Sequence, residues 1–120
     1  MKTDRISRKE HTRYTDILKQ QGSISLQDIV FCACKFELYA DNKKLQKSTS
    51  IDDLSDDNKL FTAITNKYTS FSKNFSRILH VFGIWDGVFK KGGKHKAYQF
   101  TLREALFIRR LWARVECADV

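Results

Sequence analysis

The chain has 120 residues, of which 42% are hydrophobic and 12% aromatic, and it contains no proline. That composition excludes a disordered tail and argues against a loop-rich scaffold, so we expect one domain, residues 1–120, with a modest core. The formal net charge is +8, which favours an anionic partner such as nucleic acid. No apolar run approaches the roughly 18 residues of a membrane span, and no secretory signal segment is expected at the N-terminus.

The charge is unevenly distributed along the chain. Residues 71–110 contain nine lysines and arginines against two acids, a net charge of +7. Residues 35–60 carry five basic and six acidic side chains, a net charge of −1. A basic excess that is concentrated in this way favours an anionic partner over a purely solubilising role.

A first helix is predicted over Lys2–Gln21, where sparse apolar positions recur among charged residues and Gly22 provides a stop. A second helix is predicted to start at Ser25, with Asp28 three positions on in a near capping box. The apolar run that follows, residues 29–36, predicts the central core helix. A strand is the alternative for this run, although its apolar positions do not alternate cleanly.

Cysteine usage argues against a disulfide or a metal centre. The three cysteines, Cys32, Cys34 and Cys117, are an odd number. Cys32 and Cys34 would project to different sides of a helix, because only positions three or four apart share a face. We therefore expect buried thiols in a reducing cytoplasm, or in the host cytoplasm if a phage or virus encodes the chain, with no metal and no cofactor.

The middle of the chain is predicted to be a polar loop followed by a third helix. Asp41–Asn58 is rich in serine and aspartate and is expected to hold at most one helical turn, at Ser50–Leu54. The third helix is predicted over about 56–68, where apolar residues recur on one face. Thr69 and Ser70 are expected to break it.

A fourth helix and a hairpin are predicted next. The helix, Ser72–Phe82, ends at Gly83, and a short strand over Gly87–Lys90 follows. The turn Lys91–Lys94 is expected to supply the glycines with positive φ that a hairpin needs. The return strand is predicted over Lys96–Phe100. Three aromatic residues of this region are interpreted as core: Phe82, Trp85 and Tyr98.

The order helix, short turn, helix and basic hairpin resembles the winged helix-turn-helix superfamily of DNA-binding domains over residues 56–101. The resemblance rests on this pattern and not on an invariant motif. It implies an α+β, mostly helical fold with a two-stranded β-hairpin wing and additional N- and C-terminal helices. It also implies double-stranded DNA as the partner, with the helix before the hairpin in the major groove.

By that resemblance the matching positions divide into two groups. In the helix, Arg77 would contact guanine and Asn74 adenine. The turn of the hairpin would neutralise phosphates, which raises affinity without reading much sequence. The predicted DNA-binding residues are Ser72, Lys73, Asn74, Ser76, Arg77, His80, Lys90, Lys91, Lys94, His95 and Lys96.

A last helix is predicted over about 101–117, where Thr101 and Glu104 form a capping box. It carries more apolar positions than one flank of a small core needs. In many winged-helix proteins such a helix mediates dimerisation, and a homodimer would suit a palindromic site. The alternative is that it closes the core of the monomer. The positions predicted for a dimer interface are Leu102, Leu106, Phe107, Leu111, Trp112 and Val115.

The sequence carries no pattern that predicts an enzyme: there is no HExxH, no Walker glycine loop and no GxSxG. The predicted function is DNA binding, in a transcriptional regulator or a plasmid- or phage-encoded site-binding factor. The alternative is a protein-interaction module on the same scaffold, such as a virus-encoded inhibitor that covers an acidic surface. RNA binding through the same basic patch is a third interpretation.

Overall fold

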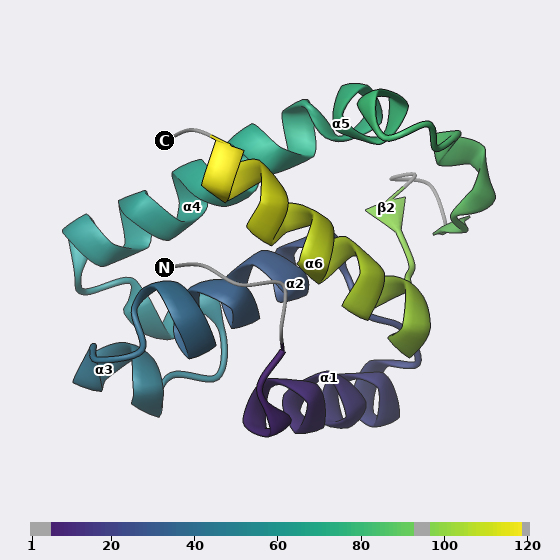
Figure 1. The fold of residues 1–120 in the computed structure, drawn as a ribbon. Helices are drawn as coiled ribbons and strands as arrows, with labels where there is room; N and C mark the ends of the chain where they lie inside the picture. The colour runs from purple at the N-terminus through teal and green to yellow at the C-terminus, as the bar shows by residue number, and fades with distance from the viewer. Residues whose placement is uncertain (1–5, 93–96, 119–120) are drawn as a thin grey trace.

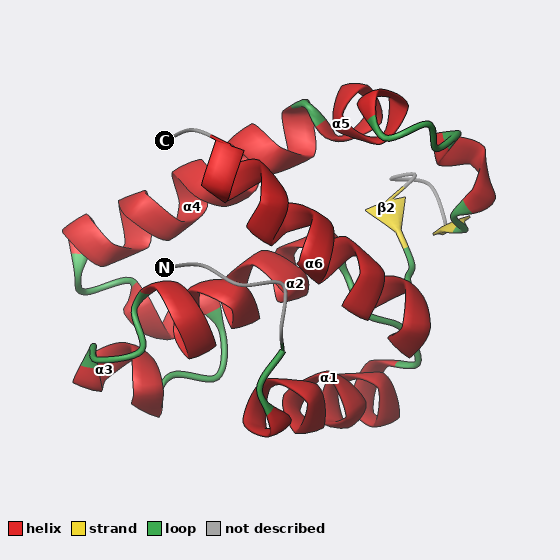
Figure 2. Cartoon of the chain, in the orientation of Figure 1, coloured by secondary structure: helices red, strands yellow, loops and turns green. Residues whose placement is uncertain are grey.

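The computed structural model describes residues 6–92 and 97–118. These residues form an α+β fold that is mostly helical and includes one two-stranded antiparallel hairpin, as Figure 2 shows, which confirms the predicted class. In chain order the elements are α1 (Arg8–Gln21), α2 (Leu26–Ala33), a π-helical turn (Cys34–Leu38), α3 (Lys43–Lys47), a 3-10 turn (Ile51–Leu54), α4 (Asn58–Lys73), α5 (Phe75–Val81), a second 3-10 turn (Asp86–Val88), β1 (Lys91–Gly92), β2 (Ala97–Tyr98) and α6 (Leu102–Ala118).

Helix α2 forms the centre of the fold. It contacts α1, α4 and α6, and Figure 1 shows α1 and α4 on opposite sides of it. All but two of its eight residues are buried, because apolar side chains point to every side of the helix. The prediction of a central core helix is confirmed, and the alternative of a strand is wrong. The helix continues into the π-helical turn, where the Tyr39 N–H donates to the Cys34 carbonyl at 2.8 Å.

Local capping signals behave as predicted. Ser25 and Asp28 exchange hydrogen bonds, each at 3.0 Å, at the start of α2. Thr101 and Glu104 do the same at the start of α6, at 2.9 and 3.2 Å. Gly22 ends α1 with a φ of 81°, a left-handed conformation that glycine adopts without strain. Each of these signals involves neighbours in sequence, so it is readable without knowledge of the fold.

Two segments differ from the prediction. Helix α1 begins at Arg8 rather than Lys2, because the Ser7 hydroxyl caps it by accepting a hydrogen bond from the Glu10 N–H at 3.2 Å. The polar segment 41–58 contains the predicted helical turn but also the short helix α3, which the prediction missed. Its buried Leu45 anchors α3 to the core.

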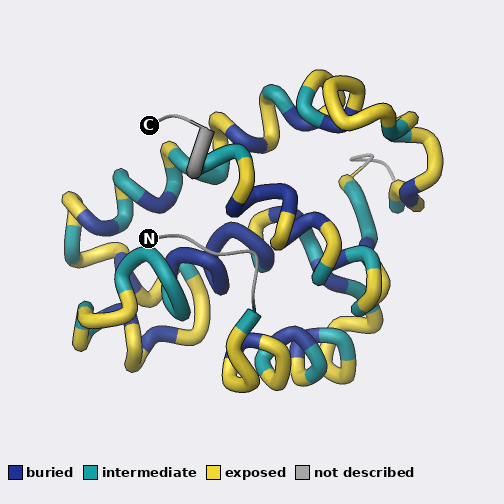
Figure 3. Tube along the Cα trace, in the orientation of Figure 1, coloured by how far each residue is buried: buried dark blue, intermediate teal, exposed yellow. Residues whose placement is uncertain are grey.

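Helix α6 closes the core against α1 and α2. Its buried face includes Ile108 and Trp112, and Figure 3 shows the central part of the helix as buried. The chain just before α6 is tied to the connector between α1 and α2: Ile24 and Phe100 exchange two backbone hydrogen bonds, each at 2.9 Å. The base of the hairpin is therefore fixed to the helical layer.

Candidate functional site

The helix that precedes the hairpin starts later than predicted. Helix α4 continues through Thr69 and Ser70 to Lys73, so the prediction that these residues break it is wrong. Asn74 separates α4 from α5: its backbone N–H and its side-chain amide both donate to the Ser70 carbonyl, at 3.2 and 2.9 Å. Ser72 and Lys73 therefore lie in the last turn of α4 and not on the predicted helix.

Helix α5 turns one face to the core and the other to solvent. Phe75 and Leu79 are buried, whereas Arg77 and His80 are exposed. Because Arg77 and His80 are three positions apart, they share the outward face. The helix ends as predicted at Gly83, which has a φ of 74°.

Arg77 lies at the edge of a cleft of about 430 Å³ between α4, α5 and the end of α6. Ser70 and Asn74 line the same cleft. Lys67 and Glu116 also line it and form an ion pair at 3.3 Å. Arg77 thus lines this cleft and is exposed.

The hairpin begins later and has shorter strands than predicted. Lys91 pairs with Tyr98, and Gly92 pairs with Ala97, in antiparallel register. The segment predicted as the first strand, residues 87–90, instead contains the end of the second 3-10 turn. Lys91 is thus in a strand and not in the turn.

Gly92 does not have the positive φ predicted for it. A Cβ at this position would meet the amide end of the Gln99 side chain at 2.2 Å, a contact that this flexible side chain can relieve by moving. Three residues predicted to contact DNA lie outside the described residues: Lys94, His95 and Lys96.

An aromatic cluster joins α5 to the hairpin. The ring of Phe75 lies 5.0 Å from that of Tyr98, 5.6 Å from that of Phe71 and 6.2 Å from that of Phe100, all in edge-to-face geometry. Phe89 adds a further ring at 6.3 Å. Such pairs stabilise beyond the area that they bury. Helix and hairpin are therefore held as a single unit.

Asp86 forms a polar link within the same unit. Its Oδ2 accepts hydrogen bonds from the hydroxyls of Ser76, at 3.0 Å, and Tyr98, at 3.3 Å. The ammonium of Lys91 lies over the Tyr98 ring, 4.9 Å from its centroid. Ser76 was predicted to contact DNA, and in the structure its hydroxyl serves this link.

Several of the predicted basic residues are exposed and have no acidic partner. Within residues 6–92 and 97–118, no ion pair or hydrogen bond engages the side chains of Lys73, Arg77, Lys90 and His80. Among them, Lys73, Arg77 and Lys90 carry positive charge that no acidic side chain of the described residues neutralises, so they can neutralise an anionic partner.

Apolar side chains are exposed next to these cations. Val81, Phe82, Trp85 and Val88 are all exposed, Trp85 by 75%. The prediction that Phe82 and Trp85 belong to the core is wrong, because the segment after α5 runs outside the core and Phe89 fills the interior position instead. We call these four exposed residues the apolar ridge.

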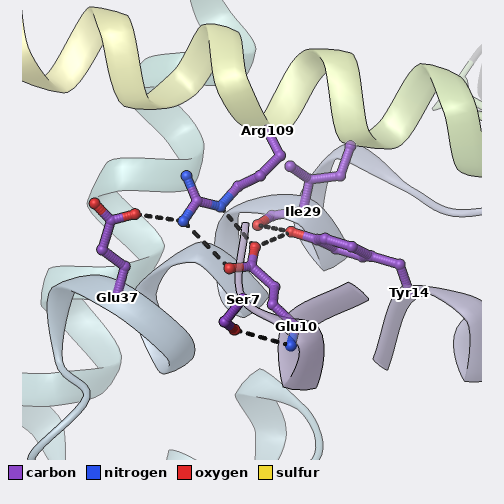
Figure 4. A network of polar contacts seen from close by, with 6 residues as sticks. All are labelled: Ser7, Glu10, Tyr14, Ile29, Glu37 and Arg109. Atoms are coloured by element: carbon purple, nitrogen blue, oxygen red, sulfur yellow. Dashed lines mark hydrogen bonds and ion pairs between the residues drawn. The ribbon is translucent and has the colours of Figure 1, made fainter. Parts of the chain in front are cut away.

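A second polar cluster lies in the interior. Arg109, counted above in the basic excess, is buried, with only 1% of its side chain exposed. Its Nε donates to Glu10 at 2.6 Å, and its Nη2 donates to Glu10 at 3.2 Å and to Glu37 at 2.5 Å. The Tyr14 hydroxyl donates to Glu10 at 2.5 Å and to the Ile29 carbonyl at 3.4 Å, as Figure 4 shows.

This cluster joins helices and is closed to solutes. Burial raises the pKa of the Glu10 carboxyl, although the Arg109 guanidinium opposes that effect. Burial and the nearby Glu10 carboxylate raise the pKa of Tyr14 well above its ordinary value. Glu10 and Tyr14 come from α1, Ile29 from α2, Glu37 from the π-helical turn and Arg109 from α6, so the contacts lock four elements together. Arg109 is unavailable to an external anion.

Two of the residues predicted for a dimer interface lie inside the monomer. Leu111 and Trp112 are buried in the core, so the prediction that they line an interface is wrong for both. Their apolar surface is used when α6 packs on α1 and α2. Phe107 is exposed. The remaining three positions are half-buried against the core: Leu102, Leu106 and Val115.

Cys32 and Cys34 are buried, and burial raises the pKa of the Cys34 thiol to about 12. The side chain of Cys117 lies outside the part of the chain that the structure describes. Across that part, no three histidine, cysteine, aspartate or glutamate side chains are grouped as metal ligands would be. Among the described helices, none combines the length and the apolar character needed to cross a bilayer.

Two features of the site were missed by sequence reasoning although a signal for each exists. Glu10 stands four residues before Tyr14, and Arg109 four residues after Ala105, so both charged residues occupy the apolar face of their helix. The exposed Trp85 lies two residues after Gly83, in a loop, where a core position is less expected.

No protein-family model, no characterised protein and no solved structure matches the chain.

Proposed function

We propose that the protein binds double-stranded DNA through α5 and the basic hairpin, in the manner of a winged helix. One observation carries this proposal. Arg77, His80 and Lys90 are exposed and without an acidic partner among the described residues, on elements that Phe75 and Tyr98 hold as one unit. The positive charges of Arg77 and Lys90, held on a helix and beside an adjoining hairpin, suit a DNA groove and its phosphates.

Helix α5 would enter the major groove with its outward face. Arg77 can donate two hydrogen bonds to the edge of guanine, and His80 lies beside it. With seven residues the helix is about 10 Å long, so roughly one turn would reach base edges. Lys73, at the end of α4, would contact phosphate. Asn74 is not expected to read adenine, because its amide nitrogen is bonded at the junction.

The hairpin would bind the backbone beside that groove. Lys90 and Lys91 would neutralise phosphates, together with the remaining cations of the turn. Contacts of this kind set affinity and register without reading sequence, and they weaken as salt is added. The same surface would serve a transcriptional regulator or a plasmid- or phage-encoded site-binding factor. A homodimer, with α5 presented twice, would recognise a palindromic site.

The apolar ridge favours a second candidate, a protein-interaction module. Four exposed apolar residues within eight positions are more than phosphate contacts need. A protein partner with an acidic and apolar surface would cover both the ridge and the cations.

Charge reversal in the hairpin tests the proposal. The double variant Lys90→Glu and Lys91→Glu should bind random-sequence duplex DNA much more weakly than the wild type. Because two phosphate contacts are lost, the slope of log affinity against log salt should fall in magnitude by roughly two. Fluorescence anisotropy with labelled duplex, titrated from low to near-physiological salt, measures both quantities.

The matched control is Lys47→Glu with Lys59→Glu, which changes the net charge equally on α3 and the start of α4, distant from the hairpin in Figure 1. It should retain most of the affinity, because the binding face is intact. Equal losses in the two double variants would mean that net charge alone drives binding. No binding by the wild type at low salt would refute DNA binding and favour the protein-interaction candidate.

A further inference from the structure

A cleft of about 390 Å³ opens beside the indole of Trp85. It lies between the end of α5 and the segment that follows, which Figure 3 shows as largely exposed. The cleft is also lined by Ser76, His80 and Asp86. Its volume falls in the range of sites that hold a small molecule or a single group of a larger ligand.

The cleft is organised before any ligand arrives. The indole of Trp85 lies against Gly87, where a Cβ would come within 2.3 Å of the ring. The absence of a side chain at Gly87 therefore makes room for the ring in this position. Asp86 is fixed by Ser76 and Tyr98, which both donate to its Oδ2. Its Oδ1 accepts no hydrogen bond from the described residues.

These features together define the chemistry of an occupant. The exposed face of Trp85 suits a flat aromatic ring, and the Asp86 carboxylate suits an amino group at the edge of that ring. The ammonium of Lys91 lies over the ring of Tyr98, whose hydroxyl donates to Asp86, so a positive charge is held on the same unit as the cleft. A planar, amino-bearing ring attached to an anion describes a nucleotide.

We propose that this cleft holds one unpaired nucleobase, stacked on Trp85, of a DNA that the basic surface binds. A base within a continuous duplex already has stacking neighbours and paired edges, so only an unpaired base gains from these contacts. The inference rests on the DNA binding proposed above and adds a substrate class, namely DNA that carries a bulged or flipped-out base.

The test compares a fully paired duplex with the same duplex carrying a single bulged cytosine. The wild type should bind the bulged duplex more tightly by roughly fivefold or more, the factor typical of one base stacked on an aromatic side chain. Trp85→Ala should abolish that preference and leave affinity for the paired duplex unchanged. Since Trp85 is exposed, circular dichroism should show the variant folded as the wild type is.

Tryptophan fluorescence provides a direct readout of stacking. The chain has two tryptophans, and Trp112 is buried, so quenching by the bulged duplex reports on Trp85. In Trp85→Phe, the remaining emission of Trp112 should not respond to DNA. Gly87→Ala keeps the indole but displaces it, and should reduce both the quenching and the preference. Phe107→Ala removes an exposed ring on α6 and should leave both unchanged.

The results distinguish a failure of the base site at Trp85 from a failure of DNA binding itself. Equal binding of both duplexes by the wild type, with no quenching, would overturn the base site while DNA binding stands. An equal loss on both duplexes in Trp85→Ala would also overturn it, because the ring would then contact DNA in general. Absence of binding to either duplex at low salt would overturn both, and would favour a protein that covers the apolar ridge.

Discussion

Replacing Arg109 by methionine is expected to lower the free energy of unfolding by about 3–5 kcal/mol near pH 7. The guanidinium bonds Glu10 through two nitrogens and Glu37 through one, and all of the Arg109 side chain except 1% is buried. Methionine fills similar space but leaves the Glu10 carboxylate in the interior without a counter-charge, with the Tyr14 hydroxyl as its remaining side-chain donor. Urea denaturation followed by circular dichroism measures the loss. Arg110→Met, at the exposed neighbouring position, should change stability by no more than about 0.5 kcal/mol.

The free energy of unfolding that Arg109→Met loses relative to the wild type should become smaller as the pH falls. Burial raises the pKa of Glu10 in the native protein, and removal of Arg109 should raise it further. A carboxyl whose pKa is higher in the folded than in the unfolded state binds its proton more tightly when folded. Acidification through that folded-state pKa therefore favours the folded state. Adding Glu10→Gln to the variant should recover stability at neutral pH. If neither acid nor Glu10→Gln restored the free energy of unfolding, the loss would come from packing and not from the unpaired charge.

Replacing Phe75 by alanine is also expected to lower the free energy of unfolding, by about 3–5 kcal/mol. The Phe75 ring is 1% exposed and contacts Phe71, Tyr98, Phe89 and Phe100. Its removal leaves a cavity where α5, α4 and the hairpin meet. Thermal or urea unfolding measures the loss.

The same variant connects stability to function. In the fraction that remains folded, the hairpin should be held less firmly against α5, so affinity for duplex DNA should also fall. Phe107→Ala makes the same chemical change at an exposed position on α6 and should alter stability by only about 0.5 kcal/mol. A stable Phe75→Ala protein with unchanged DNA affinity would mean that the two elements act separately.

Much of the fold was predictable where the signal was local, although the Ser7 cap of α1, which is equally local, was missed. Capping at Ser25 and Thr101 and the stops at Gly22 and Gly83 depend on side chains within a few positions, and all four agree with the structure. The apolar run of α2 likewise indicated its burial. Helix α4 shows the limit, because it continues through Thr69 to a turn whose Phe71 is buried against Phe75, and the local sequence does not reveal that contact.

The candidate site was predictable in charge but not in its contacts. Arg77 and Lys90 are exposed, as a helix face and a basic hairpin indicated. Arg109 carries the same charge but is buried, because its acidic partners come from distant parts of the chain. Trp85 was assigned to the core on its residue type, yet the path of the chain after α5 leaves it exposed. Whether Trp85 or Phe89 is the buried residue of this segment depends on tertiary packing.

The Glu10–Arg109 pair also has a consequence for the speed of folding. The two residues are 99 positions apart in the sequence. Helical proteins fold fast when their contacts are local, and closing so long a loop has an entropic cost that must be met before the pair can form. The pair is therefore expected to form late, after α2 and α6 have come together. An interaction that is absent from the folding transition state slows unfolding without speeding folding, so the pair acts chiefly to keep the native state from opening.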